Sequence, residues 1–395
     1  MSYFIFTFLG KYINNHSEYP NTPVDLYMLK VLEKRKELLK LIDTVAHEKG
    51  YFDVQDLVVY TSLPRSTLQD WINRFVDEGC VEVLEEGSGR KRARYARRRM
   101  RTLPASACRK IFTTADREHV EIFHQCRSEG CIAFCEYMYS KGNPFVWRNG
   151  LTLRQRVRIG EPDMRLDDRV SMGLEKVTVS NGLVHQHIRT YGGPSYSLTE
   201  MMEQAEGVLN VEYHREGDYL EGVIVTEALT HVAIGIDDTD SESGGGATFA
   251  LTLSLLDQLS SIEGVYRISH NVAFLCPDVP YKTAGNSVSY IELAVKPELV
   301  NSIIQTALEY LKSQSKSGET GMAVKIGLKM CPELHVFARK ARSSIVTMEE
   351  AMYAAKKSRI KTYEVTGPRG LIGAIASLGM LECPTDRLLD VTKKF

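Results

Sequence analysis

Three aspartates lie within four positions of the chain, and three glycines follow them closely. The residues are Asp237, Asp238 and Asp240, then Gly244, Gly245 and Gly246. Two carboxylates about 4 Å apart repel each other by roughly 1 kcal/mol in water, and by more where water is excluded. Such a cluster is therefore costly unless a cation neutralises it. Mg²⁺ binds through one or two carboxylates and completes its shell with water and substrate phosphates. The cluster predicts a magnesium–phosphate site.

The segments on either side of these aspartates are of the kind that position phosphates. Residues 231–236 are an apolar run that predicts a strand, and an amphipathic helix is expected to begin near Ala247. Glycines let the backbone approach an anion closely. A helix N-terminus directs N–H groups and the positive end of its dipole at the anion, and Thr239 or Thr248 offers a hydroxyl. The alternative is an acidic turn that only caps a helix.

Several segments, in order along the chain, resemble motifs of known families. Three of them are 234–248, with the aspartates, 279–286 (Val-Pro-Tyr-Lys-Thr-Ala-Gly-Asn) and 369–374 (Arg-Gly-Leu-Ile-Gly-Ala). Together they resemble the archaeal isoleucine-tRNA agmatinylcytidine synthetase, an ATP-dependent enzyme that joins agmatine to an anticodon cytidine. Segments 319–324 and 364–370 are similar to later motifs of the methanogenesis marker protein 11 family, which has no assigned function.

The resemblance implies roles for individual residues. Asp237, Asp238 and Asp240 would hold Mg²⁺ and the phosphates of ATP, and Asp237, Asp238 and Lys282 would be catalytic. The other cofactor-binding residues would be Thr239, Gly244, Gly245, Gly246, Thr248, Asn286, Arg369 and Gly370. Lys282 and Arg369 lie in glycine-bearing loops, where a cation and the backbone can both reach a phosphate. The alternative for each is a solvated surface charge.

Ala247 is a departure from the synthetase pattern. It stands where the synthetase has the threonine that accepts phosphate, and alanine has no hydroxyl. We therefore expect no covalent phosphate at this position.

The first part of the chain predicts a winged helix-turn-helix. Helical patterns at 29–42, 54–60 and 65–77 precede a strand at 81–84 and a return strand at 90–95. The expected recognition helix offers side chains that suit base edges and phosphates: Arg65, Ser66, Thr67, Gln69, Asn73 and Arg74. The basic run that follows would lie along a nucleic-acid backbone and contains Arg90, Lys91, Arg92, Arg94, Arg97, Arg98 and Arg99. The alternative is a winged helix for protein contacts.

The middle of the chain predicts a helix at 120–139 and strands at 151–159, 177–179 and 184–188. Arg154, Arg156 and Arg158 alternate along the first strand, so they form one basic face, which meets either phosphates or solvent.

Four residues with soft ligand atoms lie within twelve positions: His124, Cys126, Cys131 and Cys135. They offer ligands for zinc or an iron–sulfur cluster. Their spacing fits no standard motif, so buried structural thiols are the preferred interpretation.

The length of 395 residues predicts two or three domains. The expected order is a leader (1–26), the winged helix-turn-helix (27–101), a linker (102–115), an α+β middle domain (116–228), a synthetase-like α+β domain that binds ATP and Mg²⁺ (229–385) and a tail (386–395). A hydrophobic fraction of 43%, a charged fraction of 25% and a net charge of −1 are ordinary for globular proteins. Eight cysteines without a secretory signal or membrane span predict a cytoplasmic protein with free thiols.

The expected function is ATP- and magnesium-dependent chemistry on a nucleic acid or related substrate. The expected partner is DNA or RNA, with DNA favoured; no membrane partner is expected, and a homodimer is left open. The alternative is an archaeal transcription regulator whose C-terminal domain senses a nucleotide without turnover. The pair Asp237 and Asp238, with Lys282, favours chemistry, whereas Ala247 favours sensing. A third interpretation, a methanogenesis assembly factor, follows from the family resemblance alone.

Overall fold

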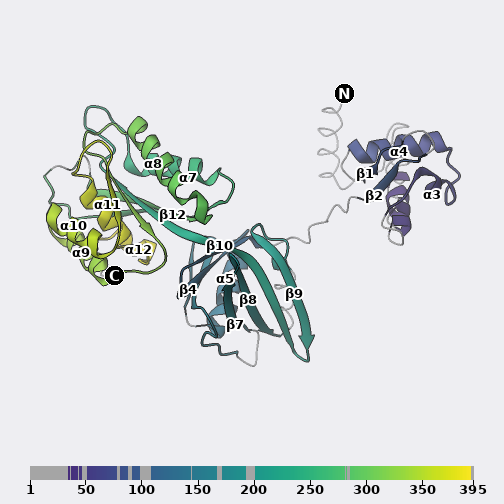
Figure 1. The fold of residues 1–395 in the computed structure, drawn as a ribbon, viewed down its shortest axis with the longest axis horizontal. Helices are drawn as coiled ribbons and strands as arrows, with labels where there is room; N and C mark the ends of the chain where they lie inside the picture. The colour runs from purple at the N-terminus through teal and green to yellow at the C-terminus, as the bar shows by residue number, and fades with distance from the viewer. Residues whose placement is uncertain are drawn as a thin grey trace, which may run out of the picture. The chain divides into compact units, whose positions relative to one another are not determined.

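The chain forms two compact units in a computed structural model, Met1–Ala105 and Ser106–Phe395 (Figure 1). The structure describes residues 34–35, 37–42, 44–46, 51–77, 81–87, 91–97, 108–143, 145–166, 171–192, 201–280, 282 and 285–392, without the side chains of residues 77, 97, 215 and 216. The predicted leader at 1–26 lies outside these residues. Within the described parts, no helix is both long enough and apolar enough to cross a membrane.

The N-terminal unit contains helices followed by a strand pair. Its elements are α3 (Val54–Val58), α4 (Arg65–Asp77), β1 (Val81–Glu85) and β2 (Arg94–Arg97), and β1 and β2 are antiparallel. Asp53 caps α3, because its side chain accepts from the Asp56 N–H while the Asp56 side chain accepts from the Asp53 N–H. A small apolar core joins these elements: Leu57, Leu68, Ile72, Phe75, Val81 and Tyr95 are among its buried members. The winged helix-turn-helix itself stays a prediction.

The first half of the second unit is mostly antiparallel sheet around one helix. Its elements are β3 (Cys108–Ala115), β4 (His119–Cys126), α5 (Glu129–Gly142), β5 (Val146–Asn149), β6 (Thr152–Arg158), β7 (Ser171–Ser180), β8 (Leu183–Tyr191), β9 (Val208–Glu216) and β10 (Tyr219–Asp237). The strand predictions at 151–159, 177–179 and 184–188 are confirmed by β6, β7 and β8.

Two sequence predictions fail at the start of this unit. Residues 108–115 are strand β3 rather than linker, and 120–139 hold strand β4 and helix α5 rather than one helix. Residues 108–115 form a strand because a tight turn follows them. The Asp116 carboxylate accepts from the N–H groups of Glu118 and His119 at 2.8 Å each, and this turn folds β4 back onto β3. The side chain of Ser128 accepts from the Cys131 N–H and so starts α5 only after β4 has ended.

Strand β10 is shared by both halves of this unit. Its residues 219–227 pair with β8 and β9, residues 228–229 pair with β3, and residues 230–237 lie between two C-terminal strands. The expected domain boundary at 228/229 therefore falls inside one continuous strand (Figure 1).

The C-terminal half is a five-stranded antiparallel sheet with helices on both faces. Its elements after β10 are α7 (Thr248–Ser260), β11 (Val265–Phe274), β12 (Ser287–Val295), η1 (Pro297–Leu299), α8 (Val300–Gln314), β13 (Gly321–Ile326), α9 (Pro332–Ser343), α10 (Met348–Lys357), β14 (Lys361–Glu364), α11 (Leu371–Leu378) and α12 (Thr385–Leu388). The strand order is β11-β12-β10-β13-β14. The α+β class is confirmed for this unit.

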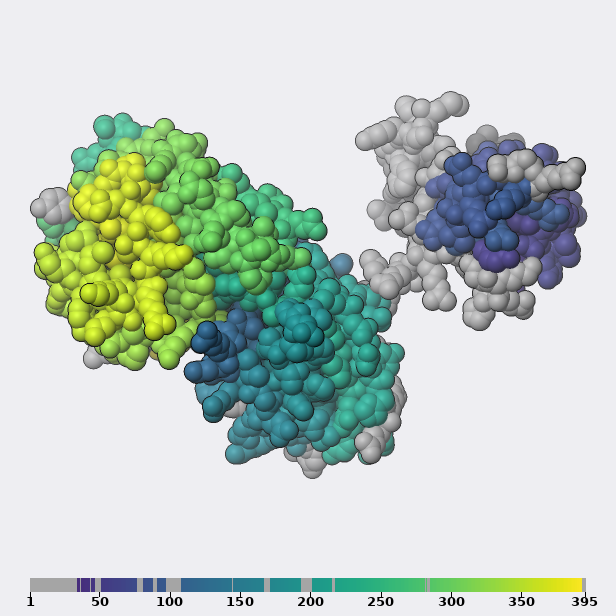
Figure 2. All heavy atoms as spheres, viewed as in Figure 1, coloured from purple at the N-terminus to yellow at the C-terminus, as the bar shows by residue number. Residues whose placement is uncertain are grey.

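Side chains alternate along β10 between the two helical layers. Val232, Ile234 and Ile236 pack against α7 and α8, whereas Ala233 faces the layer formed by α9, α10 and α11. Gly235 also faces that layer, because a Cβ there would lie 2.2 Å from the carbonyl oxygen of Ala374 in α11. In Figure 2 the C-terminal half is the part coloured from teal-green to yellow. Since α11 approaches β10 so closely, its N-terminus lies against the end of β10, where the aspartates begin.

Candidate functional site

The aspartate loop begins with a sharp turn of the backbone. Asp237 is the last residue of β10, and Asp238 adopts a left-handed conformation with φ of 58°. This conformation is uncommon for residues other than glycine, although aspartate and asparagine tolerate it better than most. Two hydrogen bonds hold it: the Asp238 N–H donates to Asp237 Oδ1 at 2.8 Å, and the Thr320 hydroxyl donates to the Asp238 carbonyl at 2.7 Å. The turn is thus fixed by a residue far along the chain.

The Asp238 carboxylate joins three segments of the chain. It accepts from Nε of Arg369 at 2.8 Å and from the hydroxyl of Ser317 at 2.8 Å. The Glu319 carboxylate accepts from the Arg369 N–H at 3.2 Å. The hydrogen bond from Arg369 to Asp238 raises the pKa of the guanidinium. Segments 316–321 and 366–373 therefore meet at the end of β10, where Arg369 lies among the carboxylates of Asp237, Asp238 and Glu319.

Asp237 lies directly against the first turn of α11. A Cβ at Gly373 would lie 1.9 Å from Asp237 Oδ2, so only glycine fits at that position. Burial raises the pKa of Asp237 to about 8; the Asp238 N–H bond opposes this rise, and the negative charges of Asp238 and Asp240 add to it. Because burial disfavours the charged form of Asp237, a cation bound beside this carboxylate would stabilise that form strongly.

Replacing Asp237 by asparagine is expected to stabilise the protein when no nucleotide is present. The pKa of the folded state, about 8, lies above the usual value of 3.8. The folded state therefore binds the proton more tightly, and the contribution of this group to the free energy of unfolding falls as the pH rises from 3.8 to about 8. At pH 8 the melting temperature of Asp237→Asn should exceed that of the wild type by about 2–4 °C, or roughly 1 kcal/mol. Thermal unfolding at pH 5 and pH 8 measures this, and an advantage that is larger at pH 5 would contradict it.

The rest of the loop prepares the start of α7. The Thr239 hydroxyl donates to Thr248 Oγ1 at 3.0 Å, and Thr248 donates to Asp240 Oδ1 at 3.1 Å. Ala247 is the N-cap residue of α7 and gives no side-chain hydrogen bond. The N-cap residue thus supplies no side-chain acceptor to the first turn, and this helix N-terminus is suited to an anion.

The glycines of this loop allow its backbone to turn sharply. Gly245 and Gly246 have φ of 67° and 102°, values that side chains rarely allow. Ser241 and Gly245 exchange two backbone hydrogen bonds, at 2.9 and 3.1 Å, and the Gly244 N–H donates to the Ser241 hydroxyl at 2.9 Å. The three glycines thus form a compact turn between the aspartates and α7.

The oxygen ligands of this loop fit Mg²⁺, but they do not form a closed cage. Among the described residues, the three aspartates do not form a tight group of ligand atoms. The Asp238 carboxylate pairs with Arg369. Asp237 is buried near two other acids, and the positive charge of Arg369 offsets their effect on its pKa only in part. One or two carboxylates with water and phosphate oxygens is the shell that Mg²⁺ usually takes in nucleotide sites.

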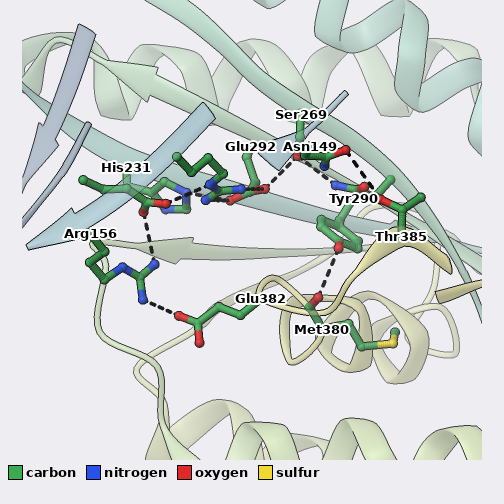
Figure 3. Close-up of polar contacts among 12 residues, drawn as sticks. Asn149, Arg156, His231, Ser269, Tyr290, Glu292, Met380, Glu382 and Thr385 are labelled. Carbon is green, nitrogen blue, oxygen red and sulfur yellow. Dashed lines mark hydrogen bonds and ion pairs between the residues drawn. The ribbon is translucent and has the colours of Figure 1, made fainter. Parts of the chain in front are cut away.

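A second group of polar side chains lies on β4, β6, β10, β11 and β12 (Figure 3). Arg154 donates through Nε to Glu121 at 2.8 Å and through both terminal nitrogens to Glu292 at 2.8 and 2.9 Å. Glu292 also contacts His231 Nε2 at 2.9 Å and accepts from the Ser269 hydroxyl at 2.7 Å. Arg154 is only 4% exposed. The expectation that the arginine stripe meets phosphates or solvent is therefore wrong for Arg154, which holds the sheets of the two halves together.

A cavity of about 1060 Å³ lies beside this network. Its lining combines aromatic rings with cations and amides: Phe145, Trp147, Tyr290, Arg148, Arg158 and Asn271 are among its residues. Arg156, which is half-buried, lines the cavity and contacts both Glu121 and Glu382 (Figure 3). Aromatic rings beside guanidinium groups are the side chains that proteins use to stack a planar base and bind its phosphate.

The sequence of the chain is similar to that of one uncharacterized protein and, over a part of its length, to those of a group of synthetases. It is 32% identical over 254 residues to the uncharacterized protein MJ0921 of Methanocaldococcus jannaschii, across 62% of this chain and 84% of that protein. The chain belongs to the family of that protein. No family model matches the chain, so the relation to methanogenesis marker protein 11 stays a prediction.

A part of the chain is related to the tRNA 2-agmatinylcytidine synthetases TiaS, which confirms that resemblance. Identity is 32% over 153 residues with the enzyme of Archaeoglobus fulgidus and 31% over 151 residues with that of Pyrobaculum neutrophilum. Each match covers 38% of this chain, and the chain spans about a third of these enzymes, 35% of each. A crystal structure of TiaS in complex with a tRNA and ATP matches at 28% identity over 38% of this chain and 36% of that one, with a TM-score of 0.35.

The structure brings some predicted site residues of this family member together and leaves others apart. Gly370 and Arg369 meet the aspartate loop. Lys282 instead donates to the Pro277 carbonyl, and Asn286 donates to the Cys276 carbonyl at 2.8 Å, so both side chains are engaged within their own loop. Within the described residues, neither hydrogen-bonds to an aspartate of the loop.

The predicted nucleic-acid side chains of the N-terminal unit are partly exposed. Arg65, Ser66, Lys91, Asn73 and Arg74 are exposed, and Thr67 and Gln69 are half-buried. Gln69 donates to Asn73 at 2.9 Å and to the Tyr95 hydroxyl at 3.0 Å. Arg92 pairs with Asp53 at 3.2 Å and Arg94 with Glu85 at 3.6 Å. Arg90, Arg98, Arg99 and the side chain of Arg97 lie outside the described residues.

Sequence reasoning missed the residues that support Asp238. Ser317 and Thr320 donate to its carboxylate and its carbonyl, and the Lys316 N–H donates to the Thr239 carbonyl at 2.8 Å. Thr320 lies in segment 319–324, which resembles a family motif, but this resemblance did not predict a role for its side chain. Ser317 and Lys316 had no signal in the sequence.

Proposed function

We propose that this chain is an ATP- and magnesium-dependent enzyme that acts on a nucleic acid. The observation that carries the proposal is the meeting of segments 237–248, 316–321 and 366–373 at the end of β10, around an acid whose pKa is raised to about 8. The relation to TiaS supports ATP as the cofactor and a nucleic acid as the substrate class.

The phosphates of ATP would lie over the aspartate loop, at the N-terminus of α7. Asp237 and Asp240 would hold Mg²⁺ together with phosphate oxygens, and the ion would offset the charge of those oxygens. Arg369, which pairs with Asp238 without nucleotide, would also face a phosphate. Lys282 would take part only after leaving the Pro277 carbonyl. The remaining residues of the proposed site are Thr239, Gly244, Gly245, Gly246, Thr248, Asn286 and Gly370.

The absence of a hydroxyl at Ala247 supports direct transfer to an external acceptor. The nearest hydroxyl in the chain, that of Thr248, already donates to Asp240. A phosphorylated intermediate at the N-cap of α7 is therefore not part of the proposal.

The cavity beside Trp147 is the proposed contact for the nucleic acid. It would take an unstacked base among its aromatic rings, with Arg148 and Arg158 near the phosphates. His231 of the network and Asp237 lie six residues apart on β10, which is about 20 Å of strand. A stretch of several nucleotides would therefore be needed to reach from the cavity to the aspartate loop.

The N-terminal unit would recruit the nucleic acid through α4 and the basic run at 90–101. Since contacts to phosphates release counterions, its affinity should fall steeply with salt. A second candidate function, a regulator that senses nucleotide without turnover, is favoured by Ala247 and by the hydrogen bond from Lys282 to the Pro277 carbonyl.

The test is incubation of the full chain with ATP, Mg²⁺ and either tRNA or duplex DNA, followed by identification of ADP, AMP and any modified nucleic acid. We expect turnover that depends on the nucleic acid and that is lost in Asp238→Asn. Tight ATP binding with no product would support the sensing regulator instead. A protein that neither binds nor converts ATP would refute both functions.

A further inference from the structure

Three thiols converge where β4 ends and α5 begins. Cys126 is the last residue of β4, and Cys131 and Cys135 lie one turn apart on α5. Their sulfur atoms all lie within 4.8 Å of one another. In a tetrahedral zinc site with Zn–S bonds of about 2.3 Å, neighbouring sulfur atoms are about 3.8 Å apart. The three sulfurs are thus within an ångström of the positions that a single metal ion needs.

A fourth thiol faces the same group from the neighbouring strand. Cys108 is the first residue of β3 and is the direct cross-strand partner of Cys126. Side chains of such partners point to the same face of the sheet, with Cβ atoms about 4.5–5.5 Å apart. Cys108 and Cys126 are 2% and 3% exposed, and Cys131 is half-buried, so an ion could enter on the side of Cys131.

His124 does not belong to this group, although it was one of the four candidate ligands in the sequence. Its ring stands edge-on to the Tyr139 ring at 5.4 Å, further along α5. Within the described part of the chain, the three cysteines are the one tight group of ligand side chains. The ligand set is therefore made of sulfur atoms alone.

The burial of these thiols favours a bound cation. Thiols are weak hydrogen-bond donors and acceptors, so four of them gain little from one another in an apolar core. A metal ion replaces their protons, which pass to solvent, and bonds all the sulfurs at once. An iron–sulfur cluster would hold its cysteine sulfurs further apart, because several iron atoms separate them. The close spacing therefore favours one ion of a thiophilic metal.

We propose that Cys126, Cys131 and Cys135 bind one zinc ion, with Cys108 as the fourth ligand. The site would join β3, β4 and the first turns of α5. Glu121 lies on β4, and Arg154 lies on β6, which pairs with β4. It is independent of the proposed function, since it lies apart from the aspartate loop and requires no nucleotide.

The test is metal analysis of the full chain purified under reducing conditions and reconstituted with Zn²⁺. We expect about one zinc ion per chain, and at least about a tenfold loss of affinity in Cys131→Ser. Cys331→Ser is the matched control: Cys331 is also half-buried and at a helix N-terminus, but outside the group, so this variant should keep its zinc. Cys108→Ser should bind zinc more weakly than the wild type.

Cobalt gives a readout that does not depend on the variants folding. Co²⁺ added to the metal-free wild type should produce intense sulfur-to-cobalt charge-transfer absorption. No such absorption, and no bound zinc, would overturn the proposal. So would iron with inorganic sulfide, or a disulfide among these cysteines in the reduced preparation. Unchanged zinc affinity in Cys108→Ser would overturn the assignment of the fourth ligand.

Discussion

An Asp238→Asn variant is expected to bind Mg-ATP at least about tenfold more weakly than the wild type, a loss of about 1.4 kcal/mol or more. The carboxylate of Asp238 accepts from Arg369 and from Ser317, and it is the point at which segments 316–321 and 366–373 are joined. Without its charge, Arg369 has no fixed position beside the phosphates, and Mg²⁺ loses one of its nearby acids. Asparagine tolerates the left-handed backbone at this position, so the turn itself should persist.

Calorimetric titration of the full chain with ATP, with and without Mg²⁺, measures this effect. Asp257→Asn is a matched control, because Asp257 also pairs with an arginine, Arg267, at 2.9 Å, but on the exposed surface. Its affinity for Mg-ATP should equal that of the wild type. Asp238→Ala should lose affinity as well, and in addition about 1 kcal/mol of stability, because alanine is strained in the left-handed region. Equal affinities of wild type and Asp238→Asn would show that the aspartate loop does not hold Mg-ATP.

Replacing Arg154 by methionine is expected to lower the free energy of unfolding by about 3–5 kcal/mol. Burial would raise the pKa of Glu121 and Glu292, but Arg154, with smaller contributions from Arg156 and His231 at Glu121 and from His231 at Glu292, lowers the pKa of both carboxyls. Both are almost fully buried, at 0% and 1% exposed. The variant leaves two buried charges without their shared cation. Removing one member of a buried ion pair is costly for this reason, even where the pair itself contributes little.

The pH dependence has a definite sign. Since the pKa of each carboxyl is lowered by folding, their stabilising contribution is present above the usual pKa of 4.5 and is lost as the pH falls below it. Denaturant unfolding should therefore show the largest difference between wild type and Arg154→Met near neutral pH, and a smaller one near pH 4. Adding Glu121→Gln and Glu292→Gln should restore part of the loss.

Arg148→Met is the matched control for this prediction. Arg148 lies on the neighbouring strand β5 and pairs with Glu129 at 3.4 Å and Glu136 at 3.0 Å, but the first of these pairs is exposed to solvent and the second is partly exposed. The same substitution there should cost about 1 kcal/mol or less. A loss of similar size in both variants would mean that the buried network is not what distinguishes Arg154.

The local parts of the candidate site could be predicted from the sequence. The apolar run before Asp237 and the amphipathic helix after Ala247 are both periodic patterns, and the structure confirms them as the end of β10 and the start of α7. The prediction at 120–139 failed because it ran one helix through the polar segment 127–130, where β4 has already ended and Ser128 caps the start of α5.

The long-range parts could not be predicted in the same way. Arg154 and Glu292 are 138 positions apart, and Asp238 and Arg369 are 131 apart, so no local pattern relates them. In the sequence, Arg154 is one of three arginines that alternate along a strand. The pairing of β6 with β4 and the position of β12 bury Arg154 between Glu121 and Glu292, and neither can be read from a local pattern. Similarity to known motifs placed Arg369 near the loop but did not give its partner.

Strand β10 also determines the order in which this protein can fold as it leaves the ribosome. Its first half can pair at once with β8 and β9, which have already been made. Its second half, 230–237, must wait for β12 and β13, and β13 ends at Ile326. At about 5–20 residues per second this interval lasts roughly 5–20 s. Both edges of the apolar segment 232–236 are unpaired until β12 is complete at Val295, and the edge that takes β13 stays unpaired for the whole interval. Slower synthesis of this stretch would therefore raise the need for a chaperone.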